Sequence, residues 1–263
     1  MLPFIHIFGH VIPMYWLCAV VGIILAFTLA TWRVKSGDFR TSQGDVACTF
    51  CMCVVGAVWG AKLFQAVGLI ALNGWDITLL RGTLNSGGVF YGGLIGGFLA
   101  VLAYICKRKI DFRDITDILV PAILHFHAIG RLGCFFAGCC YGCESTWMIA
   151  INGLIPVQLM ETGFNILVLA ALLITRPERK RPGTLLPIYA MAYACGRFLL
   201  EFMRGDASRG SFLIFSTSQW ISLLILCALT AAYIVTRRKK RTETEKVFVH
   251  CSEEYTEMAI AGE

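Results

Sequence analysis

The sequence has few charged residues. Asp, Glu, Lys and Arg make up only 15% of its 263 residues, whereas soluble domains carry roughly 25%. Proline is also scarce, with 7 residues, so few helix breakers interrupt the apolar runs. The alternating apolar and polar residues of a membrane β-barrel are absent. The formal net charge is +6, and the basic residues lie in clusters between apolar runs. We therefore expect no nucleic-acid partner. These absences exclude an ordinary soluble domain.

Long apolar runs dominate instead, because 57% of the residues are hydrophobic. Backbone groups in hydrocarbon must hydrogen-bond within their own segment, so these runs are expected to be helices. The sequence predicts an all-α polytopic membrane protein of about seven transmembrane helices around a central cavity, in one domain over residues 1–235. Residues 236–263 are predicted to be a disordered tail of basic and mixed charge. The predicted spans are residues 14–31, 46–72, 89–105, 115–129, 157–174, 184–203 and 212–235.

The basic residues indicate the orientation of these spans. Most of the 23 Lys and Arg residues follow the first, third, fifth and seventh spans. Because basic loops stay on the cytoplasmic side, we expect the N-terminus outside and the C-terminus in the cytoplasm.

The stretch over residues 130–142 reads GRLGCFFAGCCYG. A lipid-facing span needs neither its four glycines nor its arginine. Glycine permits close backbone approach, and Arg131 at membrane depth requires an anion, a carboxylate or water. Two interpretations stay open: a glycine-lined anion site beside lipid, or a tight interhelical turn with an interfacial arginine.

A polar stripe crosses the otherwise apolar sixth span. Tyr193, Arg197, Glu201 and Arg204 are spaced four, four and three residues apart, so they share one helical face. Arg197 and Glu201 can pair, which leaves Arg204 for an anion such as a lipid phosphate. The alternative is a purely structural ion pair that holds the bundle together.

Four of the 12 cysteines lie close together on the predicted outer side, at Cys134, Cys139, Cys140 and Cys143. Three roles stay open for them: packing as small residues, disulfide formation, or a metal or redox function. The other cysteines in apolar runs are expected to pack as small hydrophobic residues.

Ordered motifs along most of the chain resemble a known family. They are Tyr15 seven residues before Gly22, YGGLIG at 91–96, the stretch at 130–142, PVQLME at 156–161, the stripe at 193–204 and SQW at 218–220. Together they resemble the prolipoprotein diacylglyceryl transferases of the bacterial inner membrane.

The resemblance implies a transferase (enzyme class 2) that moves a diacylglyceryl group from phosphatidylglycerol to the lipobox cysteine thiol of a prolipoprotein. Glycerol phosphate is released. The expected partners are phosphatidylglycerol, the signal-peptide lipobox segment and membrane lipid, at an active site facing the outer leaflet of the bacterial cell membrane. The attacking thiol belongs to the substrate, and no metal or organic cofactor is expected.

The resemblance also assigns roles to residues. Arg131, Arg197, Glu201 and Tyr91 are expected to be catalytic, with Glu201 positioning Arg197. The expected substrate-binding residues are Tyr15, Gly92, Gly93, Gly96, Gly130, Gly133, Gly142, Gln158, Glu161, Tyr193 and Arg204.

The chain departs from the family pattern at several positions. Many members carry His where this chain has Tyr91, and their arginine stretch usually reads Gly-Arg-x-Gly-Asn-Phe-x-Asn-Gly-Glu. Here Cys134, Ala137 and Cys139 replace its two amides and its carboxylate. His125 or His127 can supply an imidazole, but two residues apart on a helix they cannot both face one site. The alternative function is a repurposed, non-catalytic member that binds phospholipid and carries a redox or metal-binding cysteine cluster.

Overall fold

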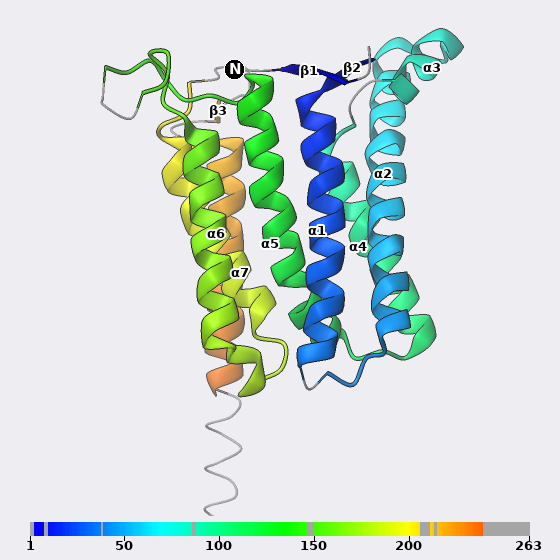
Figure 1. The fold of residues 1–263 in the computed structure, drawn as a ribbon, viewed down its shortest axis with the longest axis vertical. Helices are drawn as coiled ribbons and strands as arrows, with labels where there is room; N and C mark the ends of the chain where they lie inside the picture. The colour runs from blue at the N-terminus through cyan, green and yellow to red at the C-terminus, as the bar shows by residue number, and fades with distance from the viewer. Residues whose placement is uncertain are drawn as a thin grey trace, which may run out of the picture. The chain divides into compact units, whose positions relative to one another are not determined.

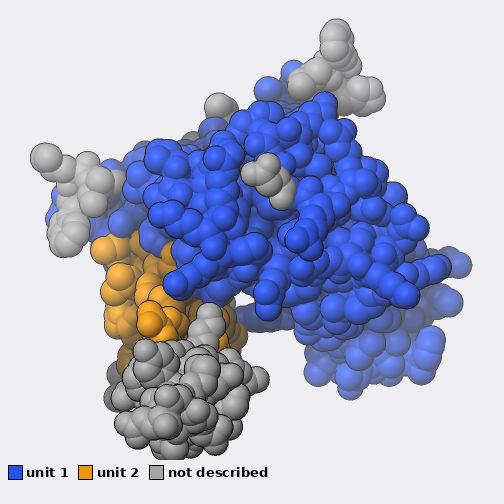
Figure 2. Space-filling model, turned by 90° about the horizontal axis from the view of Figure 1, so that it is seen from below, with its two compact units in different colours: residues 1–189 blue, residues 190–263 orange. Residues whose placement is uncertain are grey.

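The computed structural model describes residues 3–7, 10–37, 39–85, 88–146, 150–205, 211–212 and 215–238. It comprises two compact units, Met1–Tyr189 (unit 1) and Ala190–Glu263 (unit 2), distinguished by colour in Figure 2. The boundary falls inside helix α7, Leu185–Glu201. The predicted tail beyond residue 238 lies outside the described residues.

Unit 1 is built from helices. They are α1 (Met14–Ser36), α2 (Gln43–Asn73), α3 (Ile77–Asn85), α4 (Phe90–Arg108), α5 (Phe112–Ala137), α6 (Val157–Thr175) and a short 3-10 helix at Pro177–Arg179. A small antiparallel hairpin of β1 (Phe4–Ile7) and β2 (His10–Pro13) precedes α1, with Phe4 opposite Pro13. Figure 1 shows α1, α2, α5 and α6 as long, roughly aligned helices. The sequence did not predict the hairpin, since these four-residue strands carry little periodic signal.

Unit 2 contains the second half of α7 and a helix over Thr217–Arg238. Between them, β3 (Ser211–Phe212) pairs with β4 (Phe215–Ser216) in a two-stranded antiparallel ladder. The last helix begins after β4, later than the predicted span start at residue 212.

Five helices within the described ranges are long and apolar enough to cross a membrane. They are Met14–Ser36, Gln43–Asn73, Phe112–Ala137, Val157–Arg179 and Thr217–Arg238. The chain is therefore an all-helical, polytopic membrane protein in its main architecture, as the sequence predicted. Helices α4 and α7 lie at the two other predicted spans, and the count of seven stays a prediction.

Glycines bring α2 and α4 into close contact. A Cβ added to Gly60 would clash with the Gly92 carbonyl oxygen, and one added to Gly96 would clash with the Gly56 carbonyl oxygen. Real Cβ atoms do not approach so closely, so the two backbones touch only because side chains are missing here.

A polar cluster closes the end of unit 1 where α1 ends and α5 begins. The Arg33 guanidinium pairs with the Glu178 carboxylate at 2.8 Å, and both side chains are buried. On α5, the buried Asp117 carboxylate accepts hydrogen bonds from the backbone N–H groups of Gly183 and Leu185. These bonds fasten the loop after α6 to α1 and α5.

Candidate active site

The glycine-arginine stretch begins as helix rather than as a turn. Asp111 caps the start of α5 through its side chain, and the helix continues to Ala137, past the predicted end of the span at residue 129. It ends at Gly138, whose left-handed φ of 72° suits a residue without Cβ. Arg131 is therefore held at a fixed position on a helix, which rules out the interhelical-turn interpretation for this residue.

Arg131 faces a carboxylate of the neighbouring helix. Its Nε atom lies 3.0 Å from Glu161 Oε1 on α6. The carboxylate is almost fully buried, whereas 18% of the Arg131 side chain is exposed. The pair is therefore shielded on its acidic side and accessible on its basic side, an arrangement that leaves a guanidinium able to meet an anion.

His127 completes this cluster from the same face of α5, one turn before Arg131. Its Nε2 atom lies 3.5 Å from Glu161 Oε1, and Nδ1 lies 3.2 Å from the Tyr189 hydroxyl. His125 is not part of these contacts, as the two-residue spacing required. Both histidines were candidates for an imidazole near Arg131, and His127 is the one that contacts Glu161.

Buried polar side chains extend along α6 beside Glu161. Gln158 donates from Nε2 to the Cys139 carbonyl oxygen at 2.7 Å, and Asn165 donates from Nδ2 to the Glu161 carbonyl oxygen. Within the described part of the chain, no hydrogen-bond donor reaches Gln158 Oε1 or Asn165 Oδ1. Two buried acceptors thus flank the carboxylate. Asn165 was not predicted from the sequence, although its spacing of four residues from Glu161 places it on the same face.

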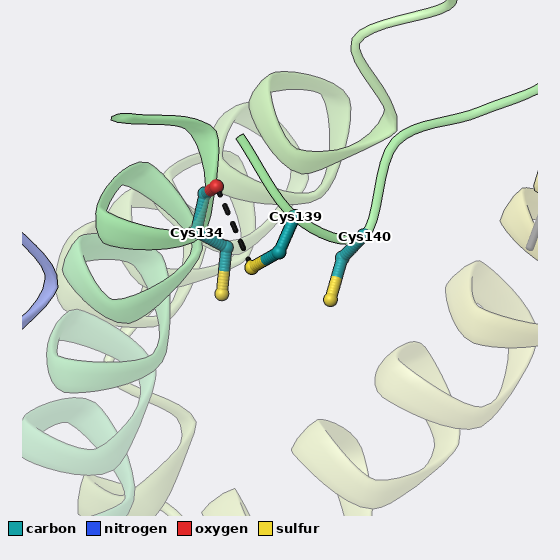
Figure 3. Close-up of side chains that lie close together, drawn as sticks. All are labelled: Cys134, Cys139 and Cys140. Atoms are coloured by element: carbon teal, nitrogen blue, oxygen red, sulfur yellow. Dashed lines mark hydrogen bonds between the residues drawn. The ribbon is translucent and has the colours of Figure 1, made fainter. Parts of the chain in front are cut away.

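The last turn of α5 and the segment that follows it carry three thiols. Cys134, Cys139 and Cys140 have sulfur atoms within 4.8 Å of one another (Figure 3). Burial, with a smaller effect of the neighbouring Cys140 thiol, raises the pKa of Cys139 above its usual value. A raised pKa keeps this thiol protonated near neutral pH and makes it a poor nucleophile.

The glycines that were predicted to bind substrate differ in what lies next to them. Gly92, Gly93 and Gly96 face α2, so helix packing already accounts for glycine at these positions. A Cβ at Gly133 would meet Cys18 on α1, whereas one at Gly130 would meet nothing within 4 Å.

The remaining predicted residues of unit 1 lie on two helices and in the segment after α5. Gly142 is buried and donates from its N–H group to the Ile155 carbonyl oxygen. Tyr15 on α1 and Tyr91 on α4 are both about half exposed.

In unit 2, the predicted stripe on α7 is an ion-pair cluster. Arg197 pairs with Glu201 at 2.6 Å, as its four-residue spacing predicted. Arg204 lies 4.0 Å from the same carboxylate, and its expected role in anion binding stays a prediction. Glu201 thus faces two guanidinium groups. The Arg197 side chain also donates to the Ser218 hydroxyl at 3.4 Å, and Tyr193 is half-buried on the same helix.

A cavity of about 170 Å³ lies at the opposite end of unit 1 from Arg131. Arg33, Asp117 and Glu178 contribute to its lining. Arg33 and Glu178 pair with each other, so each charge already has a partner. Their side chains are only 4% and 6% exposed, so little of either is accessible to a ligand. Arg131 is the more accessible cation, and we assign the candidate site to its end of the unit.

Comparison with known proteins identifies the family. Residues 3–235 match the family described as prolipoprotein diacylglyceryl transferase. The chain is 32% identical over 251 residues to a Clostridium perfringens protein named phosphatidylglycerol–prolipoprotein diacylglyceryl transferase 2, covering 91% of this chain and 96% of that relative. Proteins named phosphatidylglycerol–prolipoprotein diacylglyceryl transferase from Clostridium tetani and Streptococcus pneumoniae are each 29% identical, with coverage of 90% and 86% of this chain and 98% and 90% of the relatives. The chain belongs to the prolipoprotein diacylglyceryl transferase family.

Proposed function

We propose that this protein transfers the diacylglyceryl group of phosphatidylglycerol to the lipobox cysteine thiol of prolipoproteins and releases glycerol phosphate. Within this family, the observation that carries the proposal is the partly exposed Arg131 side chain, held at 3.0 Å from the buried Glu161 carboxylate. A fixed cation beside apolar helices suits a lipid phosphate, because it stabilises the charge that develops as the phosphate leaves.

The reaction needs one bond to form and one to break. The substrate sulfur attacks the glyceryl CH₂ carbon that bears the phosphate ester, and the carbon–oxygen bond to that phosphate breaks. The electron pair leaves with the glycerol phosphate, and the thiol proton passes to a basic group or to solvent. The nucleophile comes from the substrate, so the protein must supply charge stabilisation, orientation and a path for the proton.

The residues of unit 1 can divide these tasks. We assign phosphate binding to Arg131, and to Glu161 the orientation of that guanidinium. His127 contacts the same carboxylate oxygen and is our candidate for receiving the thiol proton, directly or through Glu161. The buried acceptors Gln158 Oε1 and Asn165 Oδ1 suit the hydroxyl groups of the glycerol headgroup, which are hydrogen-bond donors.

We keep the predicted roles of Tyr91, Tyr15 and the glycines as secondary parts of this proposal. Tyr91 is half exposed on α4, and its phenol suits hydrogen bonding better than proton abstraction near neutral pH. Gly130 has open space around its Cα and is the glycine best suited to close approach by a ligand.

For unit 2 we propose that Glu201 positions Arg197 and Arg204, and that Arg197 contributes to anion stabilisation. A carboxylate between two guanidinium groups keeps a net positive charge on the cluster, which is the charge that a phosphate requires. Tyr193 shares the helix and is proposed as a substrate contact.

We propose the predicted topology of seven spans, with the N-terminus outside and the C-terminus in the cytoplasm. The support is the concentration of Lys and Arg after alternate spans, together with helices α4 and α7 at two of the predicted spans. This orientation places Arg131 toward the outer leaflet of the bacterial cell membrane, where the lipobox segment would enter from the lipid.

The decisive experiment is a transfer assay with purified protein, phosphatidylglycerol vesicles and a lipobox peptide, following glycerol phosphate release and peptide mass. We expect release that requires the peptide thiol and stops when that cysteine is replaced by serine. Arg131→Ala should lower transfer by about 10²–10³-fold. Arg81→Ala is the matched control, because Arg81 is an exposed arginine on α3.

The assay can also refute the proposal. Wild-type protein that binds phosphatidylglycerol vesicles yet releases no glycerol phosphate with the thiol peptide would overturn it and favour a non-catalytic lipid-binding member. Equal activity of Arg131→Ala and Arg81→Ala would instead remove Arg131 from the mechanism.

A further inference from the structure

Three cysteine side chains converge at the end of α5 without a part in the proposed transfer reaction. Cys134 lies in the last turn of the helix, and Cys139 and Cys140 follow in the turn beyond it. Their sulfur atoms all lie within 4.8 Å of one another. Figure 3 shows the three side chains extending into one region. From this juxtaposition we propose that Cys134, Cys139 and Cys140 bind a thiophilic d¹⁰ metal ion, of the Zn²⁺ or Cu⁺ type.

The backbone of the turn produces the convergence. Gly138 and Cys140 both have left-handed φ angles, of 72° and 64°. The turn folds back on the helix, and the N–H group of Cys139 donates to the Cys134 carbonyl oxygen at 3.2 Å. Cys140 has a Cβ, so this backbone region is less favourable for it than for glycine. A tight return of the chain therefore brings residues five and six positions apart to one point.

Contacts from other segments hold the turn in place. Gln158 on α6 donates to the Cys139 carbonyl oxygen at 2.7 Å. Beyond the turn, Gly142 donates to Ile155, and Ile155 donates in return to Cys143. These bonds fix the backbone on both sides of Cys140, so the ligands are largely preorganised before an ion arrives.

The donor set and its spacing decide the class of ligand. Thiolate sulfur is a soft donor that selects Zn²⁺ and Cu⁺ over Mg²⁺ or Ca²⁺. Zn–S bonds of about 2.3 Å place tetrahedrally arranged sulfurs about 3.8 Å apart. Side-chain rotations can close the remaining gap of up to about 1 Å from the observed spacing. Zn²⁺ would take water as a fourth ligand, whereas Cu⁺ can remain trigonal.

The net charge of the loaded site is negative, and a nearby arginine can offset it. Each coordinating thiol gives up its proton, so three thiolates leave a net charge of −1 with Zn²⁺ or −2 with Cu⁺. Arg131 lies three residues before Cys134 on α5, and a nearby guanidinium stabilises such a net negative centre. Accessibility allows loading, because Cys139 is exposed and the other two are partly exposed.

The test is a metal titration of the full-length protein in detergent, reduced beforehand and kept anaerobic. Zn²⁺ and Cu⁺ are titrated separately against a chromophoric chelator. We expect one equivalent of at least one ion to bind tightly to the wild type, and binding to fall at least tenfold in Cys139→Ser and in Cys134→Ser. Cys143→Ser and Cys106→Ser are matched controls that should bind like the wild type, since both cysteines are exposed and lie outside the cluster.

Alkylation mapping on the wild type provides a measurement that does not depend on how the variants fold. Bound ion should protect Cys134, Cys139 and Cys140 from alkylation, and a chelator should remove that protection, while Cys106 reacts equally in both conditions. Failure of both ions to bind the reduced wild type would overturn the proposal. So would binding that persists at full strength in the Cys134→Ser and Cys139→Ser variants.

Discussion

Two of the ion pairs in unit 1 lie near opposite ends of α5, and they differ in what surrounds them. Arg33 and Glu178 are both nearly inaccessible, with 4% and 6% of their side chains exposed. At the other end, Glu161 is equally buried, but Arg131 and His127 retain 18% and 21% exposure. The first pair is closed on both sides, and the second is closed only on its acidic side.

This difference separates a structural contact from a site. A closed pair holds the end of α1 against the loop after α6, and nothing outside the protein can use its charge. A half-accessible pair has a buried carboxylate that fixes a cation in place while the cation remains available to a ligand. Breaking the first pair should therefore affect folding, and breaking the second should affect activity.

The largest effect is expected when the closed pair is broken. Arg33→Ala leaves the Glu178 carboxylate buried without its partner, and such losses cost about 3–5 kcal/mol of stability. Thermal unfolding in detergent should show a large drop in Tm, while transfer activity per folded molecule changes little.

The matched control replaces both charges. Arg33→Met combined with Glu178→Leu removes the pair without leaving a buried charge, and it should recover most of the lost stability. A double variant as unstable as Arg33→Ala would show that packing by these side chains, and not their charge, holds this end of the unit.

The second effect is on activity. Arg131→Ala removes one preorganised cation, and losses of this kind lower kcat by about 10²–10³-fold. Its Tm should fall by less than that of Arg33→Ala, because the lost side chain is partly exposed. The glycerol phosphate assay and thermal unfolding on the same preparation test both halves. A variant that unfolds like Arg33→Ala would make the two pairs equivalent and refute the comparison.

The sequence predicted the helices well because lipid-crossing segments need long apolar runs. It placed the C-terminal end of α5 eight residues too early, at residue 129 and not Ala137, since glycines and an arginine at residues 130–133 are also typical of turns. The pairing of Arg197 with Glu201 followed from helical spacing alone, whereas Arg131 and Glu161 lie thirty residues apart and meet only through packing of α5 on α6. That contact, and the resulting choice of His127 over His125, required the tertiary structure.

A third experiment sharpens the structural side of the comparison. The Asp117 carboxylate accepts hydrogen bonds from two backbone N–H groups near the Arg33–Glu178 pair. Asp117→Asn replaces one acceptor oxygen with an NH₂ group, a donor that would face an N–H group. We expect a loss of about 1–3 kcal/mol in stability, the cost of leaving a buried group unsatisfied. Urea or thermal unfolding measures it, with unchanged transfer activity per folded molecule. A selective loss of activity would mean that this end of the unit takes part in the reaction.

The smallest effect is expected at His127 if this residue only orients Glu161, because His127 Nε2 lies 3.5 Å from Glu161 Oε1, whereas Arg131 Nε lies 3.0 Å from it. If His127 only orients the carboxylate, His127→Gln should lower kcat by about tenfold, equivalent to about 1.4 kcal/mol for a hydrogen bond to a charged group. If it receives the thiol proton, the loss should reach about 10²–10⁴-fold. His125→Gln, two residues away and turned from Glu161, is the control and should remain near wild-type activity. Equal losses in both variants would mean that neither imidazole acts through the Arg131–Glu161 pair.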